Sequence, residues 1–225
     1  MRHSEPDSKN LLALATLALM VGWAALGCGE IRPHTRAVYL LLDTSGTYSR
    51  EIKKAENIAN YLLGTLQSGD SLGLARIDSA SFSEKDIVAK VTFDSRPSLT
   101  NQQKRAFRKK LDGFVGGVKG SRHTDITGGM LQAAEWLNET GAGTKYILIF
   151  SDLEQDLRAG HIRDFTIDLE DIGVVALNVT KLGSDQIDPR EYMKRLDHWE
   201  GRVRDGNGSW RVINDLDRLD RLLTN

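Results

Sequence analysis

The feature that most restricts the fold is an alternation of short apolar runs with amphipathic stretches from Ala37 to the end of the chain. Residues 37–42 (AVYLLL) and 146–150 (YILIF) carry no charge and predict strands that are buried on both faces. The stretches between such runs place apolar residues at helical spacing. Strands that alternate with helices predict a doubly wound α/β fold, in which a mostly parallel sheet has helices on both faces and so forms three layers.

The same pattern locates the individual elements. We expect strands over residues 37–42, 72–77, 87–93, 146–150, 174–179 and 210–213. We expect helices over residues 49–66, 100–114, 125–139, 188–204 and 215–223. Apolar and polar residues alternate over 87–93, which is typical of an edge strand. Residues 156–173 indicate only an irregular helix, and the whole succession fits one domain over residues 37–225.

Composition excludes several classes of function. The chain has 30 Lys plus Arg against 31 Asp plus Glu, a balance that argues against a broad nucleic-acid interface. Its single cysteine excludes an intrachain disulfide and a CxxC metal or redox site. The five histidines show no HExxH or HxH spacing, which excludes a zinc-protease type of site.

An uncharged apolar run, LLALATLALMVGWAALG, precedes the domain at residues 11–27. Its length falls between that of a signal-peptide core and that of a membrane-spanning helix. It has no polar stripe of the kind that a helix packed on a globular core shows. We therefore expect residues 1–27 to be a signal peptide or an N-terminal anchor.

The run ends at Cys28, the only cysteine, after Ala25-Leu26-Gly27. This end resembles a bacterial lipobox, in which small residues precede a cysteine that becomes lipidated. The resemblance implies that Cys28 is the lipidation site and that residues 28–36 are the lipidated cysteine and a linker. The alternative is an uncleaved anchor with an unmodified cysteine. Both interpretations tether the domain to a membrane, on the extracytoplasmic (periplasmic) side of a bacterial cell envelope.

Polar residues follow the two central apolar runs. The set consists of Asp43, Ser45 and Thr47 after the first run, Thr124 at the start of the helix over 125–139, and Asp152 after the second run. Because the carboxyl ends of parallel strands form the ligand-binding edge of such a sheet, we expect these side chains to converge there. An all-oxygen set of carboxylates and hydroxyls suits Mg²⁺, Mn²⁺ or Ca²⁺ and not zinc or copper. The neighbouring Asp125 is interpreted as a charge that stabilises the helix start.

DxSxT after an apolar strand, a threonine at a helix start and an aspartate after a later strand resemble the metal-ion-dependent adhesion site of von Willebrand factor type A (vWA) domains. The resemblance covers nearly the whole predicted domain. It implies that Ser45, Thr47 and Thr124 reach the metal directly or through water, and that Asp43 and Asp152 anchor it. It also implies that an open coordination position takes an Asp or Glu carboxylate from a partner protein, without catalysis.

Other interpretations stay open. A Mg²⁺-dependent phosphohydrolase could use Asp43 as its nucleophile. Phosphatases of that kind need DxD, however, and Ser45 cannot do the acid–base work of the second aspartate. The domain could also be a scaffold whose metal site is structural or vestigial. In the simplest alternative, Ser45, Thr47 and Thr124 only cap helices.

Overall fold

The computed structural model describes residues 34–45, 51–79, 81–177, 179, 188–214 and 216–224, all within one compact unit, Pro33–Asn225. The predicted signal peptide or anchor, the candidate lipidation residue Cys28 and the candidate ligand Thr47 lie outside the described residues. In the described ranges, no helix is long and apolar enough to cross a membrane.

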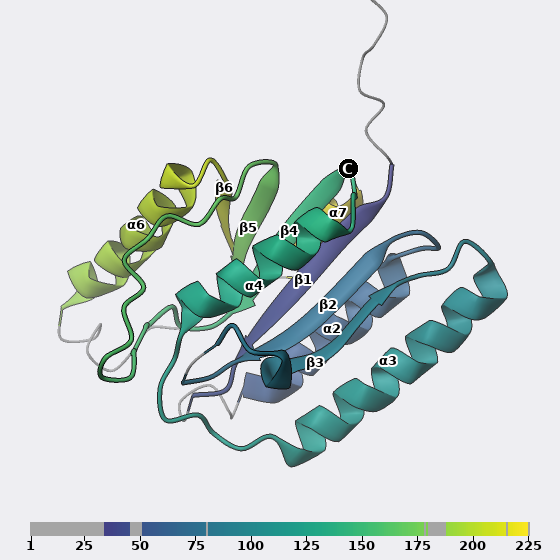
Figure 1. Cartoon of the computed structure of the whole chain (residues 1–225), viewed down its shortest axis with the longest axis horizontal. Coiled ribbons are helices and arrows are strands. Elements are labelled where there is room, and N and C mark those ends of the chain that lie inside the picture. The colour runs from purple at the N-terminus through teal and green to yellow at the C-terminus, as the bar shows by residue number, and fades with distance from the viewer. Residues whose placement is uncertain are drawn as a thin grey trace, which may run out of the picture. The chain divides into compact units, whose positions relative to one another are not determined.

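Six strands form a single sheet in the order β3-β2-β1-β4-β5-β6 (Figure 1). Their bounds are β1 Arg36–Asp43, β2 Ser71–Ile77, β3 Ile87–Thr92, β4 Thr144–Phe150, β5 Ile172–Leu177 and β6 Ser209–Ile213. All neighbouring strands are parallel except β3, which pairs antiparallel with β2 and occupies the predicted edge. The strand order reverses between β1 and β4, so the carboxyl ends of these two strands flank the crevice where this kind of sheet binds ligands.

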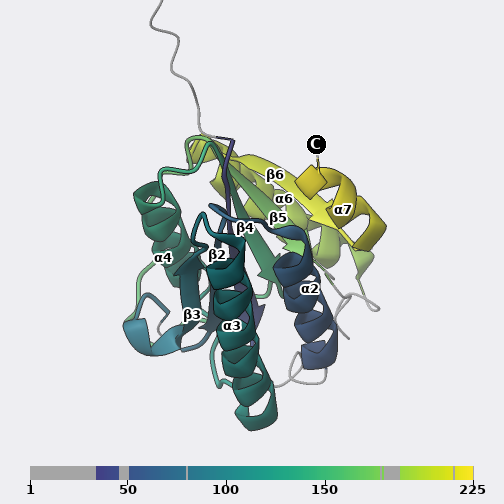
Figure 2. The ribbon, with the colours of Figure 1, turned by 90° about the vertical axis from the view of Figure 1, so that its right-hand side faces the viewer.

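Helices cover both faces of the sheet. Their bounds are α2 Ile52–Thr65, α3 Pro97–Gly117, α4 Ile126–Glu139, α6 Pro189–Asp205 and α7 Leu216–Thr224. Residues of α2, α3 and α7 pack in one apolar core, and residues of α4 and α6 pack in a second core on the opposite face (Figure 2). The predicted three-layer, mostly parallel α/β fold is therefore confirmed.

Strand β1 is buried because its side chains alternate between the two cores. Val38 and Leu40 point into the core of α2, α3 and α7, whereas Tyr39 and Leu41 point into the core of α4 and α6. Each fully buried aliphatic side chain of this kind contributes about 2 kcal/mol of stability. Gly73 of β2 lies beside Tyr39, and a Cβ at that position would approach the tyrosine ring to 2.4 Å. The uninterrupted apolar run thus fixes β1 at the centre of the molecule.

The connection between β4 and β5, residues 153–171, is irregular and is here called the strap. The prediction of an irregular helix over residues 156–173 is therefore wrong. Most backbone bonds that fix the strap lead to distant segments: Leu169 N donates to Gly206 O, and Asp156 N donates to Thr124 O, whereas His161 N closes one local turn by donating to Arg158 O. Gly206 permits this approach, because a Cβ there would lie 2.0 Å from the carbonyl oxygen of Ile167.

Candidate functional site

The first candidate ligand, Asp43, is the last residue of β1 and is only 1% exposed. Its Oδ1 accepts a hydrogen bond from the Ser45 backbone N–H at 2.8 Å, and its Oδ2 accepts one from Ser151 Oγ at 2.6 Å. The parallel register places Leu42 opposite Phe150, so Ser151 follows directly on the neighbouring strand. Burial raises the pKa of Asp43, although these hydrogen bonds oppose the shift.

Asp152 lies at the corresponding end of β4 and is 4% exposed. Its Oδ1 accepts a hydrogen bond from the Glu154 backbone N–H at 2.9 Å, and its carbonyl oxygen accepts one from Arg195 Nε at 2.8 Å. Burial raises the pKa of Asp152 to about 6, and the negative charge of Asp43 contributes to the same shift. The structure therefore brings the two predicted carboxylates together, close enough for the charge of Asp43 to act on Asp152.

The loop that carries Thr124 is fastened on both sides. On one side, Ser121 N donates to Thr44 O at 2.7 Å, which pairs this loop with the segment of Ser45. On the other side, Thr124 pairs with Asp156 of the strap through two backbone hydrogen bonds of 2.8 and 3.0 Å. Ser45 is half-buried and Thr124 is buried. The fold thus brings both hydroxyl residues to the edge that carries the carboxylates.

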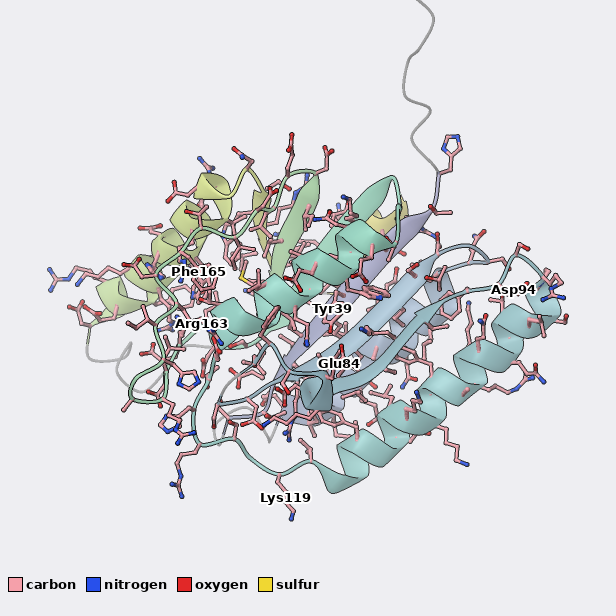
Figure 3. All side chains as sticks on the ribbon, viewed as in Figure 1. Tyr39, Glu84, Asp94, Lys119, Arg163 and Phe165 are labelled. Carbon is pink, nitrogen blue, oxygen red and sulfur yellow. The ribbon has the colours of Figure 1, made fainter. Side chains whose placement is uncertain are left out.

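Asp125 has a different role. It is the N-cap of α4, since its Oδ1 accepts a hydrogen bond from Gly128 N at 2.9 Å. Both of its oxygens also accept hydrogen bonds from Arg163 of the strap: Nε reaches Oδ1 and Oδ2 at 3.1 and 3.0 Å, and Nη2 reaches Oδ2 at 2.7 Å. Figure 3 shows Arg163 beside the N-terminal end of α4. The guanidinium neutralises this fully buried carboxylate.

Asp43 and Asp152 lack such a partner: among the described residues, neither forms an ion pair with a lysine or arginine. Two buried carboxylates without a paired cation cost free energy, which a bound divalent ion would offset. The described part of the chain contains no group of three or more His, Cys, Asp or Glu side chains that could hold a metal. A cation here would consequently depend on the hydroxyls as well, and the donor set fits a hard ion such as Mg²⁺.

Sequence reasoning did not single out three residues that organise this edge. Ser151 could have been found from the strand register, because it follows β4 beside Asp43. Gln155, whose Oε1 accepts hydrogen bonds from Thr127 N at 2.9 Å and Thr127 Oγ1 at 2.8 Å, gave no such signal. Arg163 also gave none, because its partner Asp125 lies 38 residues away in sequence.

The raised pKa of Asp152 predicts a pH dependence of stability in the absence of divalent cations. The folded-state value of about 6 lies above the ordinary value of 3.8, so the folded protein keeps this proton where the unfolded chain loses it. The contribution of this group is fully present below pH 3.8 and is lost as the pH rises through 6. We expect the loss to be on the order of 2 kcal/mol and to disappear in Asp152→Asn.

Urea unfolding from pH 4 to pH 7 measures this effect. Asp94→Asn is the matched control, because Arg96 holds the pKa of that half-buried carboxyl at about 2, below the window. Identical pH profiles for wild type and Asp152→Asn would contradict the prediction.

Comparison with known proteins shows the fold. No family profile matches the sequence, and no curated protein matches it. A von Willebrand factor type A structure from Catenulispora acidiphila is 15% identical, with a TM-score of 0.50 over 85% of this chain and 41% of that chain. The conserved hypothetical protein BatB from Bacteroides thetaiotaomicron is 13% identical, with a TM-score of 0.47 over 84% and 95%. The pilus adhesin SpaC from Lactobacillus rhamnosus GG is 12% identical, with a TM-score of 0.48 over 88% and 30%. The likeness to the Catenulispora acidiphila structure shows a vWA-like α/β fold.

Proposed function

We propose that this chain is a non-catalytic binding module that holds a divalent cation and, through it, an acidic residue of a partner protein. The observation that supports the proposal best is the burial of Asp43 and Asp152 at the ends of adjacent strands, with no lysine or arginine paired to either among the described residues. The vWA-like fold and the order of the motif residues also support it.

In this proposal, Ser45, Thr47 and Thr124 supply neutral oxygens, while Asp43 and Asp152 supply the negative charge. Mg²⁺ is the favoured ion, with Mn²⁺ or Ca²⁺ as substitutes, because all the donors are oxygens. A cation held partly by neutral hydroxyls keeps much of its positive charge and attracts a further carboxylate. The partner would therefore present an Asp or Glu side chain.

The proposal is tested with the Mn²⁺-loaded full chain and ¹³C-carboxylate acetate, the smallest ligand of the expected chemistry. Electron–nuclear double resonance should detect a ¹³C coupling, which shows that acetate binds the ion directly. Bound Mn²⁺ without any such coupling would contradict the adaptor role and support a closed, structural metal site.

We further propose that the chain performs no phosphoryl chemistry. Ser45 occupies the position at which a phosphohydrolase with Asp43 as nucleophile would need a second carboxylate. The expected result is that the Mg²⁺-loaded protein does not accelerate hydrolysis of p-nitrophenyl phosphate. Hydrolysis that Asp43→Asn abolishes would overturn this part of the proposal.

Tethering to the bacterial envelope is proposed from residues 11–28 alone. Cys28→Ser should remove the lipid mass from the protein without changing the affinity for Mn²⁺, because the cysteine precedes the domain. Intact-mass spectrometry and metal titration check the two expectations. If Cys28→Ser is processed like the wild type and still pellets with membranes, the uncleaved anchor is favoured.

A further inference from the structure

A cleft lies at the β6 edge of the sheet, between β6 and α7. It has a volume of about 590 Å³ and is lined by Arg211, Val212, Ile213, Arg218, Arg221 and Leu222. Strand β6 contributes the first three of these residues, and α7 contributes the others (Figure 2). Three guanidinium groups therefore gather around one partly apolar cleft.

Arg211 is a charged residue at a sheet position where the neighbouring strand has an apolar one. Side chains alternate along β6, so Arg211 and Ile213 face the layer of α7 while Trp210 and Val212 pack toward the other core. On the neighbouring strand, the residue in register with Arg211 is the buried Val175. An arginine thus stands where the adjoining strand has core valine.

The guanidinium of Arg211 is exposed and forms no hydrogen bond or ion pair with any described residue. Arg218 and Arg221 are three residues apart, so they share one face of α7, which they present to the same cleft. Asp220 of the same helix accepts a hydrogen bond from the Tyr61 hydroxyl of α2. The cleft consequently brings guanidinium groups from two elements beside the apolar side chains of Ile213 and Leu222.

We propose that this cleft binds the phosphate group of an anionic ligand. Arginine presents a planar fork of donors that matches phosphate oxygens, and the apolar side chains beside it suit a ligand with a hydrocarbon part. The source that we favour is the headgroup of an anionic phospholipid. Arg36 at the start of β1 donates a hydrogen bond to the Leu223 carbonyl oxygen in α7, so this helix ends where the chain enters the domain from the proposed tether.

The test titrates the detergent-solubilised full chain by calorimetry after divalent cations have been removed, so that no phosphate can bind through the proposed metal site. The probes are glycerophosphoglycerol, glycerophosphocholine and pyrophosphate. Tighter binding of glycerophosphoglycerol identifies a lipid headgroup as the source, whereas binding of pyrophosphate alone identifies a free phosphate compound; both results support the cleft.

Arg211→Ala should weaken binding of the phosphate probe about tenfold or more. Arg211→Lys should weaken it less, because lysine keeps the positive charge but lacks the planar fork of donors. Arg108→Ala is the matched control: it removes the same charge from the exposed basic face of α3, outside the cleft. Circular dichroism confirms that each variant is folded. The proposal is overturned if none of the three probes binds, or if Arg108→Ala weakens binding as much as Arg211→Ala.

Discussion

Arg163→Met is expected to lower the free energy of unfolding by about 3 kcal/mol. The substitution leaves the fully buried Asp125 carboxylate without the guanidinium that neutralises it. It also removes the hydrogen bond from Arg163 Nη2 to Ser81 O, which joins the strap to the loop after β2. Because Asp125 caps α4, we expect the helix start and the strap to loosen together.

Urea unfolding measures this loss, and Arg190→Met is the matched control. Arg190 also donates to a neighbouring carboxylate, Asp188, but its side chain is 84% exposed, so its removal should leave the free energy of unfolding nearly unchanged. The double variant Asp125→Asn/Arg163→Met should recover part of the stability, because no unpaired charge remains buried. Equal losses for Arg163→Met and Arg190→Met would show that the buried pair has no special role.

Asp43→Asn is expected to have opposite effects on metal binding and on metal-free stability. Loss of the carboxylate should weaken Mn²⁺ affinity at least about 100-fold. At neutral pH, the same change removes a buried charge that has no paired cation, so the metal-free protein should become about 1 kcal/mol more stable. Asparagine keeps the acceptor for the Ser45 N–H and nearly the same volume.

Asp70→Asn is the control for this pair of effects. Asp70 is also buried, but it lies at the opposite edge of the sheet and is paired with Arg36 at 2.9 Å. The same substitution there should lower stability and leave Mn²⁺ affinity unchanged. If Asp43→Asn instead destabilises the metal-free fold as Asp70→Asn does, the carboxylate of Asp43 is a structural group and the functional interpretation fails.

The parts of the fold that could be predicted are those in which the local pattern and the tertiary environment agree. AVYLLL and YILIF are uninterrupted because β1 and β4 are covered on both faces, and Pro189 marks the start of α6 because proline suits the first turn of a helix. The carboxyl edge could be predicted for the same reason, since its residues directly follow these strands.

The strap could not be predicted, because contacts distant in sequence determine its course. Arg202 of α6 donates hydrogen bonds to the carbonyl oxygens of Arg163 and Phe165, and Ile167 and Leu169 of the strap are buried in the core shared with α4 and α6. These contacts join the strap to a helix more than 30 residues away in sequence, so the local pattern did not indicate them. The helix α3 begins at Pro97, three residues before the predicted start, because its first turn, PSLT, shows no apolar stripe.

The proposed function depends above all on whether the carboxyl edge between β1 and β4 holds a divalent cation. The most direct test is a crystal structure of the Mn²⁺-loaded protein, with the ion located by its anomalous scattering. We expect one strong peak at the edge defined by Asp43, Asp152 and Thr124. A map without a peak there, from crystals grown at millimolar Mn²⁺, would contradict it.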